Sequence, residues 1–184
     1  MRRSVSLLIA RSRCDDRKVK FAALDYELEF ETSAEETLAP TGVLAQHKAV
    51  HRRIVAQFLG NACLPVTVMT SSDAPAGSGP SSTLVVAMIE AYRELLALPL
   101  GEYGVANLAY QIERVDVGQA GGRQDQYAAT FGGINFMEFS GEQTIVNPLR
   151  IRRATLTELE AMLVLYFTGI SRESARIITS SRRC

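Results

Sequence analysis

The chain has 184 residues, of which 47% are hydrophobic and 22% are charged. These values are typical of a folded chain and unlike those of a disordered one, and the length accommodates one domain, or at most two. Lysine and arginine together number 20 and balance 20 acidic residues. This balance excludes a global positive field, so we expect neither nucleic acid nor a membrane as a partner.

The first strong pattern lies at residues 24–31, where apolar and acidic side chains alternate. A period of two predicts a strand with one buried and one solvated face. Apolar residues at helical spacing then predict a helix over residues 43–59, which ends at Gly60 and Asn61. Residues 65–70 form a short predicted strand.

The clearest predicted helix begins after residue 80, has an apolar stripe from Leu84 to Leu96 and ends at Pro99. A second predicted helix around residues 105–112 ends at Gly118 and is followed by a predicted loop over residues 118–133. Further along the chain, the patterns predict a hairpin at residues 136–139 and 144–146, a strand at 162–167 and a last helix at 171–178.

The cysteines and the N-terminal residues indicate the cellular compartment of the protein. Cys14, Cys63 and Cys184 are odd in number and have no C-x-x-C spacing, so we expect neither a disulfide framework nor a zinc knuckle. The apolar run that begins at Val5 is closed by Arg11 and is too short for a signal peptide. These features favour the cytoplasm.

Residues 72–83 join a predicted strand to a predicted helix through a loop rich in glycine and serine. Backbone N–H groups and the positive end of the helix dipole meet at such a junction and favour an anion, most simply phosphate. Gly77 and Gly79 allow the backbone to approach a ligand closely, and the neighbouring hydroxyl groups can bind phosphate or Mg²⁺. The alternative is an ordinary capped helix after a turn.

Other known site motifs fit this loop poorly. No lysine follows Gly79, as the Walker motif requires, and Ser82 stands where the dinucleotide fingerprint needs a third glycine. The Gly77-Ser78-Gly79 run is too short for the nucleophile elbow of a serine hydrolase. His47 and His51 lie four residues apart but lack the adjacent glutamate of a zinc protease, so we expect surface or packing roles for them.

A second polar cluster contains Glu113, Asp116 and the run 121–126. Glu113 falls late on a predicted helix, and Asp125 follows a flexible glycine pair that can aim its carboxylate into a cleft. Two such groups can supply a metal ligand and a general base. The alternative is a solvated helix residue and a turn-forming aspartate.

The order of these motifs resembles that of the GHMP kinases. The shared features are Pro75-x-x-x-Gly79, the serines at 81 and 82, Glu113, and Gly-Gly-x-x-Asp125-Gln126. Further stretches, such as 98–101, 131–133 and 146–149, are similar to the D-glycero-D-manno-heptose 7-phosphate kinases of that family. The resemblance covers about residues 40–178.

This resemblance implies an α+β fold, namely the GHMP kinase N-terminal domain of the ribosomal protein S5 domain 2-like type, incomplete and followed by the start of the C-terminal domain. The implied division is a divergent segment over residues 1–18, an ATP-binding domain over 19–153, and the start of a C-terminal domain over 154–184.

The resemblance also implies an activity, the Mg²⁺-dependent transfer of the γ-phosphate of ATP to the anomeric hydroxyl of a heptose 7-phosphate. Chemically, positioning and charge neutralisation are the main needs of phosphoryl transfer. By position, the nucleotide would be bound by Pro75, Ala76, Gly77, Ser78, Gly79, Ser81, Ser82 and Thr83, the metal by Ser81 or Ser82 together with Glu113, and the sugar by Gly122, Arg123 and Gln124. Asp125 would be the catalytic residue that orients or deprotonates the attacking sugar hydroxyl.

The chain departs from the family pattern in three places. The run Gly79-Pro80-Ser81 is two residues shorter than the corresponding family loop, and Pro80 has no N–H group to donate. The sugar-binding segment that opens family members is absent from residues 1–18, and so is their C-terminal glycine-rich motif. We therefore expect a chain truncated at both ends, for which the alternative function is a non-catalytic remnant that binds nucleotide weakly or acts as an interaction domain.

Overall fold

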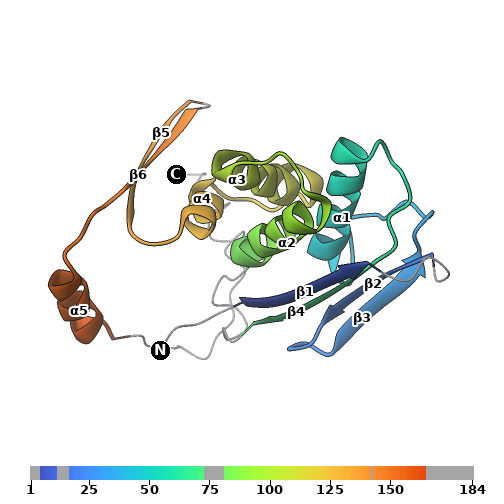
Figure 1. The fold of residues 1–184 in the computed structure, drawn as a ribbon, viewed down its shortest axis with the longest axis horizontal. Helices are drawn as coiled ribbons and strands as arrows, with labels where there is room; N and C mark the ends of the chain where they lie inside the picture. The colour runs from blue at the N-terminus through green and yellow to red at the C-terminus, as the bar shows by residue number, and fades with distance from the viewer. Residues whose placement is uncertain (1–4, 12–16, 73–80, 142, 165–184) are drawn as a thin grey trace.

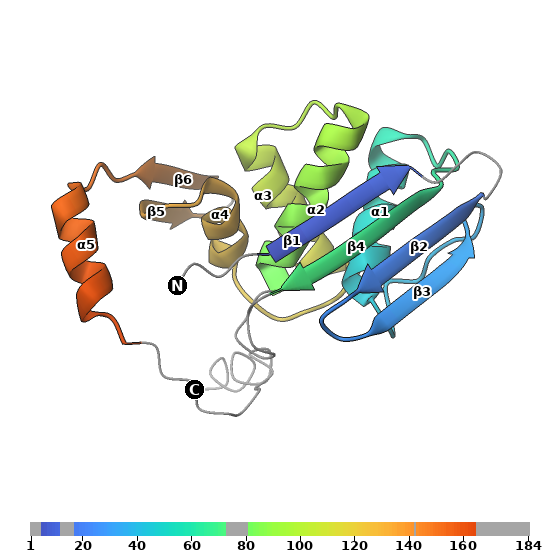
Figure 2. The ribbon, with the colours of Figure 1, turned by 60° about the horizontal axis from the view of Figure 1, so that its bottom comes forward.

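The computed structural model describes residues 5–11, 17–72, 81–141 and 143–164. Its larger sheet has the strand order β1 (Val5–Arg11), β4 (Val66–Ser72), β2 (Lys18–Ala23) and β3 (Leu28–Ser33). The two central strands, β2 and β4, run parallel, and each edge strand is antiparallel to its neighbour. Figure 2 shows the sheet in front of the helices, with one face uncovered by them.

The helices α1 (Ala45–Phe58), α2 (Ser81–Leu96) and α3 (Glu102–Gln111) lie on the other face of this sheet (Figures 1 and 2). A π-helical turn, η1 (Ile112–Asp116), continues α3, and the short helix α4 (Gln124–Phe131) contacts both α2 and α3. Among the described residues, no helix combines the length and the apolar character that crossing a membrane requires.

The main core fills the space between the sheet and the helices. The strands alternate as a half-covered sheet requires: Val66 and Val68 of β4 are fully buried, while Met69, the next residue, is 36% exposed on the other face. The helices contribute apolar side chains at helical spacing, such as Val85 and Ile89 of α2. This packing holds the start of α2 beside one end of the sheet (Figure 2).

The C-terminal part of the described chain extends away from this core. The hairpin of β5 (Asn135–Ser140) and β6 (Gln143–Pro148) joins α3 and α4 through a small second cluster of Ala106, Tyr127 and Val146. Helix α5 (Arg153–Met162) has no buried residue and lies apart from the sheet (Figure 1). Several large apolar side chains of this part are exposed, Met162 and Val164 most of all.

The helices predicted at residues 43–59 and 84–96, the strand at 65–70 and the hairpin are confirmed. The strand predicted over residues 24–31 is wrong in its first half, because residues 24–27 form the turn between β2 and β3. Glu27 has a φ of 53°, and the backbone N–H of Tyr26 donates to the carbonyl of Ala23, which closes the turn. The alternation was therefore partly coincidental, and Leu24 and Tyr26 are exposed.

The loop predicted over residues 118–133 is also wrong, because it contains α4. Buried contacts of Gln126 and Tyr127 stabilise this short helix, and tertiary packing of this kind does not appear in local patterns. The strand predicted at 162–167 is wrong over residues 162–164, because Met162 ends α5 and the next two residues are in no strand. Residues 165–167 and the helix predicted at 171–178 lie outside the described residues. Within the segment 1–18, residues 5–11 form β1 of the same sheet.

His47 and His51 are packing residues, as expected. Both are buried on α1, where the Nε2 atom of His47 lies 3.0 Å from Thr70 Oγ1 and the Nδ1 atom of His51 lies 2.8 Å from the hydroxyl of Tyr92. Thr70 Oγ1 donates to the carbonyl of Ala22, so His47 is the donor to Thr70. Burial lowers the pKa of each histidine to about 4 and raises the pKa of Tyr92.

We predict that these histidines make the fold sensitive to mild acid. The unfolded chain takes up protons below about pH 6.5, whereas the folded chain keeps both rings neutral until pH 4 is approached. Their contribution is therefore complete above pH 6.5 and is lost as the pH falls toward 4, by up to about 3 kcal/mol for each histidine.

The measurement is urea unfolding at several pH values for the wild-type chain and for the His47→Gln and His51→Gln variants. Each substitution should make the free energy of unfolding less dependent on pH between 6.5 and 4. Equal slopes in all three proteins would show that the histidines titrate normally.

Candidate functional site

Three polar side chains from separate elements meet in the interior at the start of α2. Ser82 of α2 donates from Oγ to Glu113 Oε2 of η1 at 2.8 Å. Gln126 of α4 donates from Nε2 to both Ser82 Oγ, at 3.2 Å, and Glu113 Oε2. Glu113 and Gln126 have no exposed surface, and Ser82 is 4% exposed. The three side chains, named here the Ser82–Glu113–Gln126 network, tie α2, η1 and α4 together.

The π-helical turn explains how Glu113 reaches this position. The N–H of Val117 donates to the carbonyl of Ile112 at 2.9 Å, five residues back rather than four. The widened turn allows two consecutive side chains, Ile112 and Glu113, to be fully buried, the first in the apolar core and the second against Ser82. Such turns occur frequently at functional sites.

Two oxygen atoms of the network have no partner within the described part of the chain, Glu113 Oε1 and Gln126 Oε1. Buried acceptors are normally paired, and unpaired oxygens beside a buried carboxyl group suit a hard cation such as Mg²⁺. The described residues contain no cluster of three His, Cys, Asp or Glu side chains that would hold a metal alone. The donor set therefore fits Mg²⁺ whose remaining ligands are water and phosphate oxygens.

A bidentate ion pair fixes the end of η1. Arg53 of α1 donates to Asp116 from Nε at 2.8 Å and from Nη2 at 2.6 Å, and Arg52 approaches the same carboxylate at 3.9 Å. The side chain of Asp116 is only 10% exposed, so the pair is partly shielded from water. The pair attaches η1 to α1 through Asp116, which follows Glu113 in the same turn.

Arg114 shapes the glycine-rich segment between η1 and α4. Its Nε donates to the carbonyl of Gly122 at 3.0 Å, and its Nη1 donates to that of Gln119 at 3.4 Å. A Cβ atom at Gly121 would lie 2.6 Å from Arg114 Cζ, so a larger residue at this position would displace the guanidinium group. The segment that leads to Asp125 is thus held by a side chain.

The structure brings some of the predicted site residues together. Ser82 and Glu113 are in contact, Ser81 is partly buried at the start of α2, and Thr83 is exposed. Gly122, Gln124 and Asp125 are exposed at the start of α4, and the Arg123 guanidinium carbon lies 5.0 Å from the centre of the Tyr110 ring. Pro75, Ala76, Gly77, Ser78 and Gly79 lie outside the described residues.

Sequence reasoning assigned no role to Gln126, Arg114 or Arg53. Gln126 belongs to the motif that contains Asp125, but its contacts across three elements depend on α4, which the patterns did not predict. Arg53 and Asp116 are 63 residues apart, and no local signal connects them. The pairing of Arg114 with the glycine segment follows from the π-helical turn, which has no reliable sequence pattern.

The sequence and the fold of the chain are similar to those of known proteins. Residues 46–133 match the model of the GHMP kinases N terminal domain. The chain is 51% identical over 166 residues to the D-glycero-alpha-D-manno-heptose 7-phosphate kinase of Campylobacter jejuni, an alignment that covers 89% of this chain and 49% of that protein.

Two solved structures are similar. A putative sugar kinase from Campylobacter jejuni superposes with a TM-score of 0.81 at 45% identity, covering 96% of this chain and 55% of that one. A D-glycero-D-manno-heptose 1-phosphate kinase from Bacteroides thetaiotaomicron superposes with a TM-score of 0.83 at 39% identity, covering 96% and 58%.

The α+β fold, with its buried network at the start of α2, is therefore that of a GHMP kinase N-terminal domain. Residues 46–133 are thus a GHMP kinase N-terminal domain, and the proteins to which the chain is similar include kinases of heptose phosphates. The chain spans about half the length of the relatives that it matches.

We predict that the Arg53–Asp116 pair contributes to stability because it is partly buried. Arg53→Met should lower the free energy of unfolding by about 1–3 kcal/mol, since it leaves Asp116 shielded from water without its bidentate partner. The matched control is Arg17→Met, which removes a pair with Glu35 whose side chains are 72% and 61% exposed. This control should change the stability by less than about 0.5 kcal/mol. Equal losses measured by urea unfolding would contradict the prediction.

Proposed function

We propose that the protein is an ATP-dependent kinase that phosphorylates a hydroxyl group of a heptose phosphate. The observation that carries the proposal is the fully buried Glu113, which contacts Ser82 at the start of α2 and keeps one carboxyl oxygen unpaired in the described structure. Such a group is suited to a metal that accompanies a nucleotide triphosphate. The similarity to two heptose phosphate kinases supports the sugar as acceptor.

The nucleotide would lie at the start of α2. Backbone N–H groups and the helix dipole favour phosphate there, and the hydroxyls of Ser81 and Thr83 are near enough to this end to donate to phosphate oxygens. Ser82 and Glu113 would hold Mg²⁺, with Ser81 as a further candidate. When bound, Mg²⁺ neutralises the charge that develops on the transferred phosphate. Residues 75–79, which the sequence predicts to bind the nucleotide, lie outside the described residues.

The acceptor would lie at the start of α4. We propose that Asp125 takes the proton of the acceptor hydroxyl. The hydroxyl oxygen then forms a bond to the γ-phosphorus of ATP, while the bond between that phosphorus and the bridging oxygen of ADP breaks. Gly122, Arg123 and Gln124 would contact the sugar. Asp125 is exposed, so its carboxylate is accessible to a ligand.

We further propose that the acceptor is a heptose 7-phosphate and that its anomeric hydroxyl reacts. The two named relatives differ in the phosphate position that their names give, 7-phosphate in one and 1-phosphate in the other. An anomeric hydroxyl is more acidic than an ordinary alcohol, which suits a single carboxylate as base. A reducing cytoplasm that supplies ATP and Mg²⁺ is the compartment that this activity implies.

A second candidate function is nucleotide binding without turnover. The observation that favours it is the shortened run Gly79-Pro80-Ser81, where proline has replaced a possible N–H donor. Calorimetry with Mg²⁺ and ATP, combined with an assay of ADP release in the presence of heptose 7-phosphate, separates the two functions. Binding without ADP release would favour the second.

We predict that Asp125→Asn abolishes phosphoryl transfer but changes the Kd of ATP only a few-fold. Asparagine keeps the size of the side chain and cannot accept the hydroxyl proton, which typically lowers the rate by about 100- to 10,000-fold. Asp25→Asn, in the exposed turn between β2 and β3, is the matched control and should retain full activity. If ATP binding and turnover fell together, Asp125 would have a structural role.

We predict that Glu113→Gln weakens Mg²⁺ binding. The neutral amide retains the shape of the side chain but lacks the charge that attracts the ion, so the Mg²⁺ concentration needed for nucleotide-dependent thermal stabilisation should rise by about 10-fold or more. Glu160→Gln, on the exposed helix α5, should leave that concentration unchanged. A folded Glu113→Gln variant with wild-type Mg²⁺ dependence would remove Glu113 from the metal site.

A further inference from the structure

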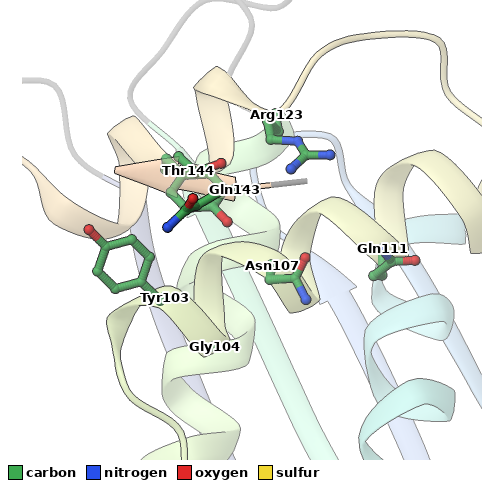
Figure 3. A pocket seen from close by; sticks show the side chains of 8 residues that line it. Tyr103, Gly104, Asn107, Gln111, Arg123, Gln143 and Thr144 are labelled. Atoms are coloured by element: carbon green, nitrogen blue, oxygen red, sulfur yellow. The ribbon is translucent and has the colours of Figure 1, made fainter. Parts of the chain in front are cut away.

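A cavity of about 610 Å³ lies between α3, α4 and the hairpin, outside the buried network. Its size is within the range of small-molecule sites, roughly 300–1,000 Å³. Three elements form its walls, and the polar side chains that line it, shown in Figure 3, are Tyr103, Asn107, Gln111, Arg123, Gln143 and Thr144.

The walls of the cavity are fixed to one another. The hydroxyl of Tyr103 on α3 accepts a hydrogen bond of 3.0 Å from the backbone N–H of Val146 on β6. The rings of Tyr103 and Tyr127 meet edge to face at 6.2 Å, which joins α3 to α4. The cavity is therefore a structural feature of three packed elements rather than a gap beside a single helix.

The chemistry of the lining favours an anion that carries several hydroxyl groups. Among the described residues that line the cavity, Arg123 is charged and none is acidic. Its guanidinium group packs over the ring of Tyr110, which orients the planar group whose edge suits phosphate. The amides of Asn107, Gln111 and Gln143 can both donate and accept, as sugar hydroxyls do.

Thr144 carries a buried hydroxyl group beside the cavity. Its Oγ1 atom is buried and has no hydrogen-bond partner within the described part of the chain, although the residue lines the cavity. A buried hydroxyl without a partner is unusual in a folded protein.

The cavity and Asp125 are both at the start of α4. Arg123 is the N-cap residue of α4, without a capping hydrogen bond from its side chain, and Asp125 lies in the first turn, two residues later. Side chains two residues apart leave a helix on nearly opposite sides, so a ligand that joins the cavity to Asp125 must cross the start of α4 over a distance on the order of 10 Å. A seven-carbon sugar phosphorylated at its far end has a comparable length between the reacting hydroxyl and the phosphate.

We propose that this cavity holds the phosphate end of the acceptor sugar, with Arg123 as the residue that recognises the phosphate and Asn107 and Gln111 as contacts to the sugar chain. This inference rests on the proposed function, since it assumes that the acceptor reacts at Asp125. The cavity would then be the part of the protein that selects a phosphorylated sugar over an unphosphorylated one.

The test is calorimetric titration, without ATP, of D-glycero-D-manno-heptose 7-phosphate and of the unphosphorylated heptose. Wild type should bind the phosphorylated sugar at least about 10-fold more tightly. Arg123→Met should weaken binding of the phosphorylated sugar by about 10- to 100-fold and leave binding of the heptose within about 2-fold. Arg150→Met, an exposed arginine outside the cavity, is the matched control and should change neither Kd.

Two further variants keep the test decisive if Arg123→Met does not fold, which circular dichroism would show. Asn107→Leu and Gln111→Leu remove sugar contacts, so both should weaken the two ligands by a similar factor. The proposal is overturned if wild type does not prefer the phosphorylated sugar, if folded Arg123→Met weakens both ligands equally, or if filling the cavity with Asn107→Leu has no effect.

The outcome is independent of turnover. Selective binding that depends on Arg123, in a chain that releases no ADP, would support the cavity and contradict the kinase activity. Phosphoryl transfer with equal preference for the two sugars, unchanged in Arg123→Met, would support the activity and contradict the cavity.

Discussion

A carboxyl group without any exposed surface governs the arrangement of this protein. Burying Glu113 is unfavourable unless neighbouring groups replace the water that it loses. Ser82 and Gln126 do so for one of its oxygens, and they come from helices on either side of η1 in the sequence. The packing of α2, η1 and α4 is therefore a condition for burying this group, and the same packing places Ser81 and Asp125 at neighbouring helix starts.

The apolar core and the polar network have separate tasks. The sheet and the helices α1, α2 and α3 bury valine, isoleucine and phenylalanine side chains in one continuous cluster, which supplies most of the favourable burial. Two arginines orient the irregular backbone between α3 and α4. Arg53 forms an ion pair with η1, and Arg114 forms hydrogen bonds with the glycine segment before α4. Side chains that carry chemistry thus lie on irregular backbone that is attached to a regular scaffold.

Several parts of this structure were predictable from the sequence because their signals are local. The apolar stripe of α2 and the proline after it predicted that helix, and the order of glycine, serine and acidic residues predicted the family. Gln126 and Arg53 were not predictable, because their roles depend on partners far away in the sequence. The strand predicted at residues 24–31 was wrong in its first half for a related reason. The alternation of apolar and acidic residues continues through the turn at Leu24 and Tyr26, where the backbone of Glu27 is left-handed and not extended.

The π-helical turn makes the length of the chain between α3 and α4 as important as its composition. In a regular helix, each residue rotates the chain by about 100° about the helix axis. The π-helical turn contains one residue more than a regular turn, and this extra residue does not shift the helix that precedes it. Deleting one residue from Ile112–Asp116 would allow a regular helix, but it would turn Glu113 or Asp116 away from its partner. Relatives that conserve every polar side chain here would still differ in this site if their spacing changed by a single residue.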